Sequence, residues 1–107
     1  MVMNLCSREQ GVIIKSEFGN YSFDREKRAY LEIEIQLFDG WLTTMTFDSD
    51  MVYDILAQFL PNYSYRTVSG LIGRRVELQY DSDSLTSAPI AMRPKSNSTW
   101  FYKKVFV

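Results

Sequence analysis

The sequence predicts a single α+β domain: a mainly antiparallel β-sheet of about five to six strands packed against one amphipathic helix. Three observations lead to this fold class. The 107 residues suffice for one hydrophobic core but not for two, so we take residues 1–107 as a single domain. Apolar residues make up 46% of the chain, which is enough to build that core. Strand patterns lie before and after one helical pattern instead of alternating with it.

The clearest pattern is a β-hairpin between Tyr30 and Phe47. Apolar and polar residues alternate along 31–37, as in a strand with one buried and one solvated face. Asp39-Gly40 suits the positive φ angles of a type I′ turn, and strand-forming residues resume at Trp41.

A single helix is predicted directly after the hairpin. Asp48, Ser49 and Asp50 supply capping side chains and negative charge for its N-terminus, and Pro61 ends it. The apolar residues in between fall on one helical face: Met51, Val52, Ile55, Leu56, Phe59 and Leu60. We expect this face to cover the apolar side of the sheet.

Weaker strand patterns complete the sheet. Val12–Ile14 is a short β-branched run after Gly11, and Arg75–Tyr80 alternates after the turn glycines Gly70 and Gly73. Short strands are also predicted at 21–23 and 89–92, and a final strand at 100–107.

The absence of histidine argues against catalysis. It removes the usual general base and the commonest transition-metal ligand, so we expect no enzyme, no metal and no cofactor. Carboxylate chemistry at Glu32 and Glu34 stays an alternative to a solvated strand face. The glycines and arginines of 70–75 lack the ending of a phosphate loop and favour a turn into a strand.

Charge is unevenly distributed along the chain. Residues 1–60 carry 5 basic and 10 acidic side chains, whereas residues 61–107 carry 7 basic and 3 acidic ones. The acidic hairpin and helix, with aromatic anchors, suggest a surface that binds a basic region of another protein. Its candidate residues are Glu32, Glu34, Asp39, Trp41, Asp48, Asp50, Asp54, Tyr63 and Tyr65. A solvated face with a core tryptophan is the alternative.

The C-terminal half suggests a second role, in nucleic-acid binding. Basic residues around exposed aromatics on a sheet are a common way to hold single strands. The candidate residues are Arg74, Arg75, Arg93, Lys95, Lys103 and Lys104, near the aromatic run Trp100–Tyr102. A dedicated binder usually has a clear basic excess, whereas the net charge here is −1.

Four parts of the sequence resemble landmarks of small phage and mobile-element proteins. They are the run from Leu31 to Trp41, the segment Thr46-Phe47-Asp48 with the helix after it, the run from Leu71 to Leu78, and Trp100-Phe101. The resemblance spans roughly residues 11–103, and the chain departs from that pattern after Trp41, where the family is often Gly-rich. It implies an infected bacterial host as the setting. It further implies an inhibitor of host defence, of the anti-CRISPR kind, that binds a defence or nucleic-acid-handling protein.

Two further features bear on location and assembly. Cys6 is the only cysteine, and no apolar run approaches the roughly 20 residues that cross a bilayer, so we expect a cytoplasmic protein without membrane contact. An unpaired sheet edge or the C-terminal strand leaves room for a homodimer.

Overall fold

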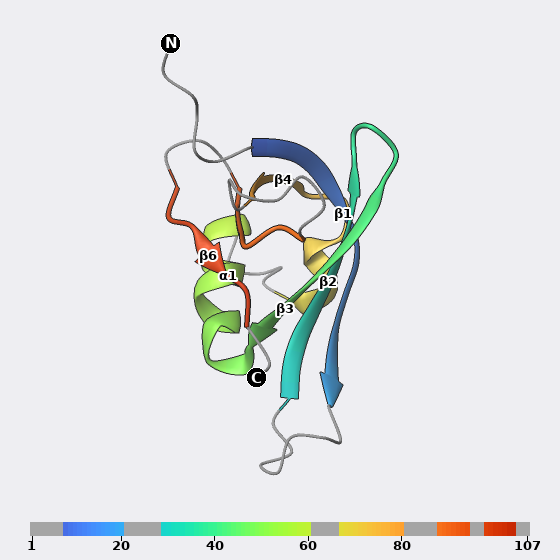
Figure 1. The fold of residues 1–107 in the computed structure, drawn as a ribbon. Helices are drawn as coiled ribbons and strands as arrows, with labels where there is room; N and C mark the ends of the chain where they lie inside the picture. Colours follow the sequence, from blue (N-terminus) through green and yellow to red (C-terminus); the bar gives the residue numbers. More distant parts are fainter. Residues whose placement is uncertain (1–7, 21–28, 61–66, 81–87, 95–97, 105–107) are drawn as a thin grey trace.

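The computed structural model contains a six-stranded antiparallel sheet and one helix, as the sequence predicts (Figure 1). It describes residues 8–20, 29–60, 67–80, 88–94 and 98–104. The strands are β1 (Arg8–Asn20), β2 (Ala29–Leu37), β3 (Leu42–Asp48), β4 (Arg75–Gln79), β5 (Ala91–Arg93) and β6 (Phe101–Tyr102). The helical segments are η1 (Ser49–Met51), α1 (Val52–Phe59) and η3 (Val68–Leu71), of which η1 and η3 are 3₁₀ helices.

The strand order β3-β2-β1-β4-β5-β6 contains a Greek key. β1, β2 and β3 form a meander, and β4 returns past the helix to lie beside β1, which gives the order β4-β1-β2-β3. Beyond β6, the backbone N–H of Lys104 donates to the carbonyl of Thr46 in β3 at 2.6 Å. The two ends of the sheet therefore meet at this point, and the sheet curls into a nearly closed barrel.

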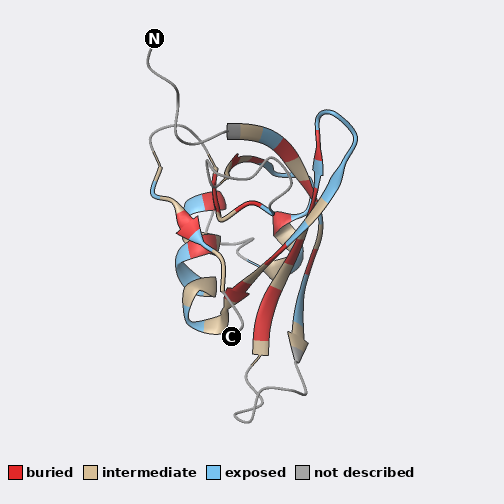
Figure 2. Ribbon diagram, viewed as in Figure 1, coloured by how far each residue is buried: buried red, intermediate tan, exposed pale blue. Residues whose placement is uncertain are grey.

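The core fills the inside of this curled sheet, where the buried residues of the central strands gather (Figure 2). Its most deeply buried sheet residues include Ile13, Leu31, Ile33, Ile35, Met45, Phe47, Leu78 and Met92. β1 and β2 approach closely at Gly11, where a Cβ would stand 2.7 Å from the carbonyl oxygen of Gln36. The apolar residues of the alternating run 31–37 face the core, as predicted.

The helix begins where the capping residues predict. The side chain of Asp48 accepts a hydrogen bond from the backbone N–H of Asp50 at 3.3 Å, and the first turn is 3₁₀ before α1 continues. Ile55 and Phe59 on the apolar face of α1 are buried, and the Phe59 ring lies 6.4 Å from that of Phe101 in β6. α1 consequently lies beside β6 (Figure 1).

The structure differs from the sequence prediction in three places. β1 extends over thirteen residues, far beyond the predicted 12–14, because it pairs with both β2 and β4. The hairpin loop is Phe38–Gly40, closed by bonds from Gly40 N–H to Leu37 C=O and from Leu37 N–H to Trp41 C=O. It is one residue longer than a type I′ turn, with Gly40 at φ +100°. β6 is shorter than predicted, and the predicted strand at 21–23 lies outside the described residues.

Candidate functional site

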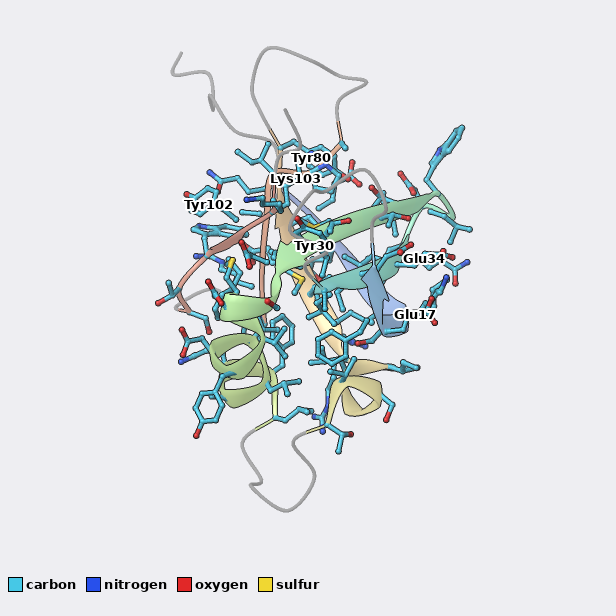
Figure 3. The ribbon with its side chains drawn as sticks, turned by 90° about the horizontal axis from the view of Figure 1, so that it is seen from below. Glu17, Tyr30, Glu34, Tyr80, Tyr102 and Lys103 are labelled. Carbon is cyan, nitrogen blue, oxygen red and sulfur yellow. The ribbon has the colours of Figure 1, made fainter. Side chains whose placement is uncertain are left out.

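Carboxylates gather on the outer face of β1 and β2. The register of the two strands shifts between Ile13 and Lys15, so an extra residue is inserted in β1. After this bulge, Glu17 lies opposite Glu32, and Lys15 lies opposite Glu34. Directly opposed residues of antiparallel strands share a face, so all four side chains project from the barrel together. Glu17 and Glu34 accordingly point to the same side in Figure 3. We call these four residues the acidic band.

One amine sits among the three carboxylates of the acidic band. Lys15 Nζ lies 3.1 Å from a carboxylate oxygen of Glu17. The pKa of Lys15 is raised, first by its hydrogen bond to Glu17 and further by the negative charges of Glu17, Glu32 and Glu34. Lys15 therefore stays charged at neutral pH. The acidic band keeps a net negative charge, with its carboxylates on the solvent side.

The hairpin tip carries exposed apolar side chains. Trp41 is 73% exposed, and Phe38 and Leu42 are 59% and 57% exposed. The loop is held by the side chain of Asp39, which accepts a hydrogen bond from the backbone N–H of Trp41 at 3.1 Å. A depression beside the tip is lined by Glu9, Gln10, Phe38 and Asp39. Apolar surface and carboxylates thus occur side by side.

The acidic residues predicted as one surface occupy separate places. Glu32 and Glu34 lie on β2, and Asp39 lies at the hairpin tip. Asp50 and Asp54 are exposed in the first turns of η1 and α1, and α1 lies on the opposite side of the molecule from β1 and β2 in Figure 1. Asp48 caps the helix and pairs with Lys104 at 3.7 Å, which gives it a structural role. Tyr63 and Tyr65 lie outside the described residues.

Arg93 is taken up by contacts within the fold. It is 7% exposed, and its guanidinium donates two hydrogen bonds to one carboxylate oxygen of Glu77, at 2.6 and 3.2 Å. The same guanidinium lies 4.0 Å from the centre of the Trp100 ring. A cation between a carboxylate and an indole is well satisfied and is not presented to a ligand. Two members of the predicted basic-aromatic face, Arg93 and Trp100, therefore hold the C-terminal strands together.

The remaining basic candidates do not form one cluster. Arg74 and Arg75 are exposed at the start of β4, and the Arg75 guanidinium lies 5.8 Å from the centre of the Phe38 ring. Lys103 and Lys104 follow β6 at the far end of the strand order, where Lys104 pairs with Asp48. Lys95 lies outside the described residues. The guanidinium of Arg75 belongs instead to the surroundings of the hairpin tip.

Sequence reasoning missed three residues of this surface. Glu17 joins Glu32 only through the bulge in β1, which no sequence pattern announces. Leu42 is the exposed first residue of β3, although it begins a run typical of a core strand. Phe38 could have been identified from the sequence, because an aromatic residue next to the Asp39-Gly40 turn of a solvated hairpin lies away from the core.

Comparisons of the chain with protein-family models, curated proteins and solved structures gave no match. Among the described residues, no helix has the length and hydropathy to span a membrane. The same part of the chain holds no group of three or more side chains arranged to ligate a metal ion. The surface formed by the acidic band and the hairpin tip is the candidate site that remains.

Proposed function

We propose that this chain is a non-catalytic binding protein that docks on a basic, nucleic-acid-handling protein and occludes it. In the setting that the sequence resemblance implies, the target is a bacterial host defence complex and the chain is an inhibitor of the anti-CRISPR kind. The observation that carries the proposal is the acidic band, in which Glu17 and Glu32 are held opposite each other on neighbouring strands.

Opposed like charges are unfavourable in an isolated sheet, which makes their position informative. A directly opposed glutamate pair destabilises the strand pairing by a few tenths of a kcal/mol. Lys15 offsets only part of the charge of the three carboxylates around it. Such an arrangement gains free energy when a positively charged surface approaches, and it accelerates the encounter with a basic groove.

The hairpin tip supplies the apolar contact that the acidic band lacks. Interfaces gain most of their free energy from a few aromatic side chains that become desolvated at the centre. Trp41 and Phe38 are exposed on a loop fixed by the Asp39 side chain, so little conformational entropy is lost when they bind. The bound partner is therefore expected to combine a basic rim with an apolar pocket.

A competition experiment tests the proposal. Purified nucleic-acid-guided defence complexes are incubated with labelled DNA and increasing amounts of this protein, and the release of DNA is followed by fluorescence anisotropy. We expect displacement by the wild type and a loss of at least about tenfold in potency for a triple charge reversal, E17K/E32K/E34K. Trp41→Ala should weaken displacement by a similar factor.

Asp54→Lys is the matched control, because it reverses an exposed charge on α1, on the other side of the molecule from the acidic band. This variant should displace DNA as the wild type does. Equal potency of the folded triple variant and the D54K variant would remove the acidic band from the proposal. Displacement by none of the proteins from any complex would remove the inhibitory function.

Direct nucleic-acid binding is the second function, favoured by the exposed side chain of Tyr102 next to Lys103 (Figure 3). It has less support, because Arg93 and Lys104 already pair with carboxylates. Small Greek-key barrels that bind oligonucleotides use the face of strands 2 and 3, and here that face carries Glu32 and Glu34. Titration of single-stranded and duplex DNA at low salt decides the matter, since a phosphate binder must bind most tightly there.

A further inference from the structure

One row of side chains crosses the outer face of four strands. Val12 of β1 lies opposite Gln36 of β2 on one side and opposite Arg75 of β4 on the other. Gln36 in turn lies opposite Leu42 of β3. Directly opposed residues of antiparallel strands share a face, and Glu34 projects from the same face as Gln36 because side chains alternate along a strand. Arg75 and the acidic band therefore lie on one face of the sheet.

An apolar area separates Arg75 from the carboxylates on this face. Val12 in the row is half-buried, and Ile14, which the bulge leaves without an opposite residue on β2, is 39% exposed. Neighbouring strands lie about 4.8 Å apart and alternate residues about 6.7 Å apart, so the Cα atoms of Arg75 and Glu34 are about 12 Å from each other. The face thus has a positive end, an apolar middle and a negative end.

The Arg75 side chain is exposed but held in place. Its guanidinium lies 5.8 Å from the centre of the Phe38 ring, a distance at which the ring attracts the cation. The backbone N–H of Phe38 donates to the carbonyl of Gln10 at 3.2 Å, which ties the ring to β1. A guanidinium stacked on a ring loses little conformational freedom on binding, and its planar N–H groups fit a carboxylate at two points.

We propose that Arg75 belongs to the same docking surface as the acidic band and binds a carboxylate of the partner protein. This inference rests on the proposed function and sharpens it. The partner carries basic side chains and an acidic one about 12 Å apart, with an apolar contact between them. A nucleic acid fits this face poorly, because a polyanion lying over it would also meet the acidic band.

Titration with two synthetic peptides tests the contact to Arg75. The first peptide has lysines at one end, leucines in the middle and a glutamate at the other end, about four extended residues from the nearest lysine. The second has lysine in place of the glutamate. Amide chemical shifts of isotope-labelled protein at low salt give the Kd of each. We expect the wild type to bind the first peptide at least about threefold more tightly. Arg75→Glu should reverse this preference, because its carboxylate repels the glutamate.

Arg74→Glu is the matched control. It makes the same charge change at an exposed side chain, but the backbone of Arg74 bonds to Ile13, one position outside the row. This variant should keep the wild-type preference, and the amide spectra show whether each variant is folded. Equal preference in the R75E and R74E proteins contradicts the role of Arg75. A wild type that binds both peptides equally, or neither, contradicts it as well.

The peptide titration and the DNA displacement assay separate this inference from the proposed function. A wild type that prefers the first peptide but displaces DNA from no complex keeps the Arg75 contact and loses the inhibitory function. A wild type that displaces DNA but shows no preference between the peptides keeps the inhibitory function and loses the Arg75 contact.

Discussion

The two halves of the sheet use their charged residues differently. In β4 to β6, Arg93 is buried against Glu77 and Trp100, so this charge holds strands together. In β1 and β2, the carboxylates of the acidic band face solvent with Lys15 as the amine among them. The Arg93–Glu77 pair is enclosed by the fold and contributes to its stability, whereas the acidic band lies on the outer face of the sheet. The C-terminal half thus keeps its charges inside the fold, and the proposed function places recognition on the other half.

The largest effect is expected from breaking the buried ion pair in the C-terminal half. Glu77→Leu leaves the Arg93 guanidinium mostly buried without its carboxylate, and we expect it to lower the free energy of unfolding by about 3–5 kcal/mol. Urea denaturation measures this loss. The double variant E77L/R93M should recover much of it, because no buried charge is then left unpaired. A loss below about 1 kcal/mol would show that the pair behaves as a surface salt bridge.

A smaller loss of stability is expected from disturbing the contact between β1 and β2. These two strands, which carry the acidic band, are held together by packing and not by charge. Gly11→Ala places a methyl group 2.7 Å from the backbone carbonyl oxygen of Gln36, so we expect a loss of about 1–3 kcal/mol. Gly19→Ala, in the same strand, meets only the flexible end of Glu32 at 3.7 Å and is the matched control. Thermal unfolding of both variants should show a clear difference in Tm. Equal Tm values would mean that the strands separate easily at Gly11.

The acidic band itself should contribute little to stability. Glu32→Gln removes one of two opposed carboxylates, and we expect the free energy of unfolding to change by less than about 0.5 kcal/mol. The same denaturation assay gives the value. Set beside Glu77→Leu, this result would sharpen the division between the two halves. A loss of about 2 kcal/mol or more would instead give Glu32 a structural role.

A further effect appears only in strong alkali, at Tyr80, the residue directly after β4. Burial, followed by the negative charges of Glu9 and Asp39, raises the pKa of Tyr80 from 10.0 to about 12. Between these pH values the unfolded chain loses the phenolic proton while the folded protein retains it. The contribution of Tyr80 to stability is thus fully present below pH 10 and is lost as the pH rises from 10 through 12. Tyr80→Phe should flatten this part of the stability profile, and an unchanged slope would contradict the assignment.

The sequence predicts the elements whose patterns are local. The hairpin alternation and the Asp48 cap depend on neighbouring residues, so the strands around Asp39-Gly40 and the start of the helix were predicted correctly. The length of β1 was not, because its mostly polar residues 15–20 are held in a strand by pairing with β2. Long-range pairing of this kind leaves no periodic signal in one strand.

The site was predicted only in part for the same reason. Glu32 and Glu34 were identified from their alternation, but Glu17 reaches them through a bulge. The C-terminal basic residues form a cluster in the sequence, yet Arg93 turns to Glu77, which precedes it by sixteen positions. The distribution of charge along the sequence therefore does not show which charged side chains the fold pairs with each other. That pairing depends on the three-dimensional arrangement of the strands.

The most direct test of the proposed binding is how the rate of association depends on salt. The target is a defence complex from which this protein displaces DNA. Stopped-flow measurements compare the wild type with E32K/E34K, a variant that retains the Trp41 anchor. We predict that the wild-type rate falls by about tenfold or more as salt increases, and that the variant associates slowly with little dependence on salt. Equal association rates and equal salt slopes for the two proteins would contradict a binding surface centred on the acidic band.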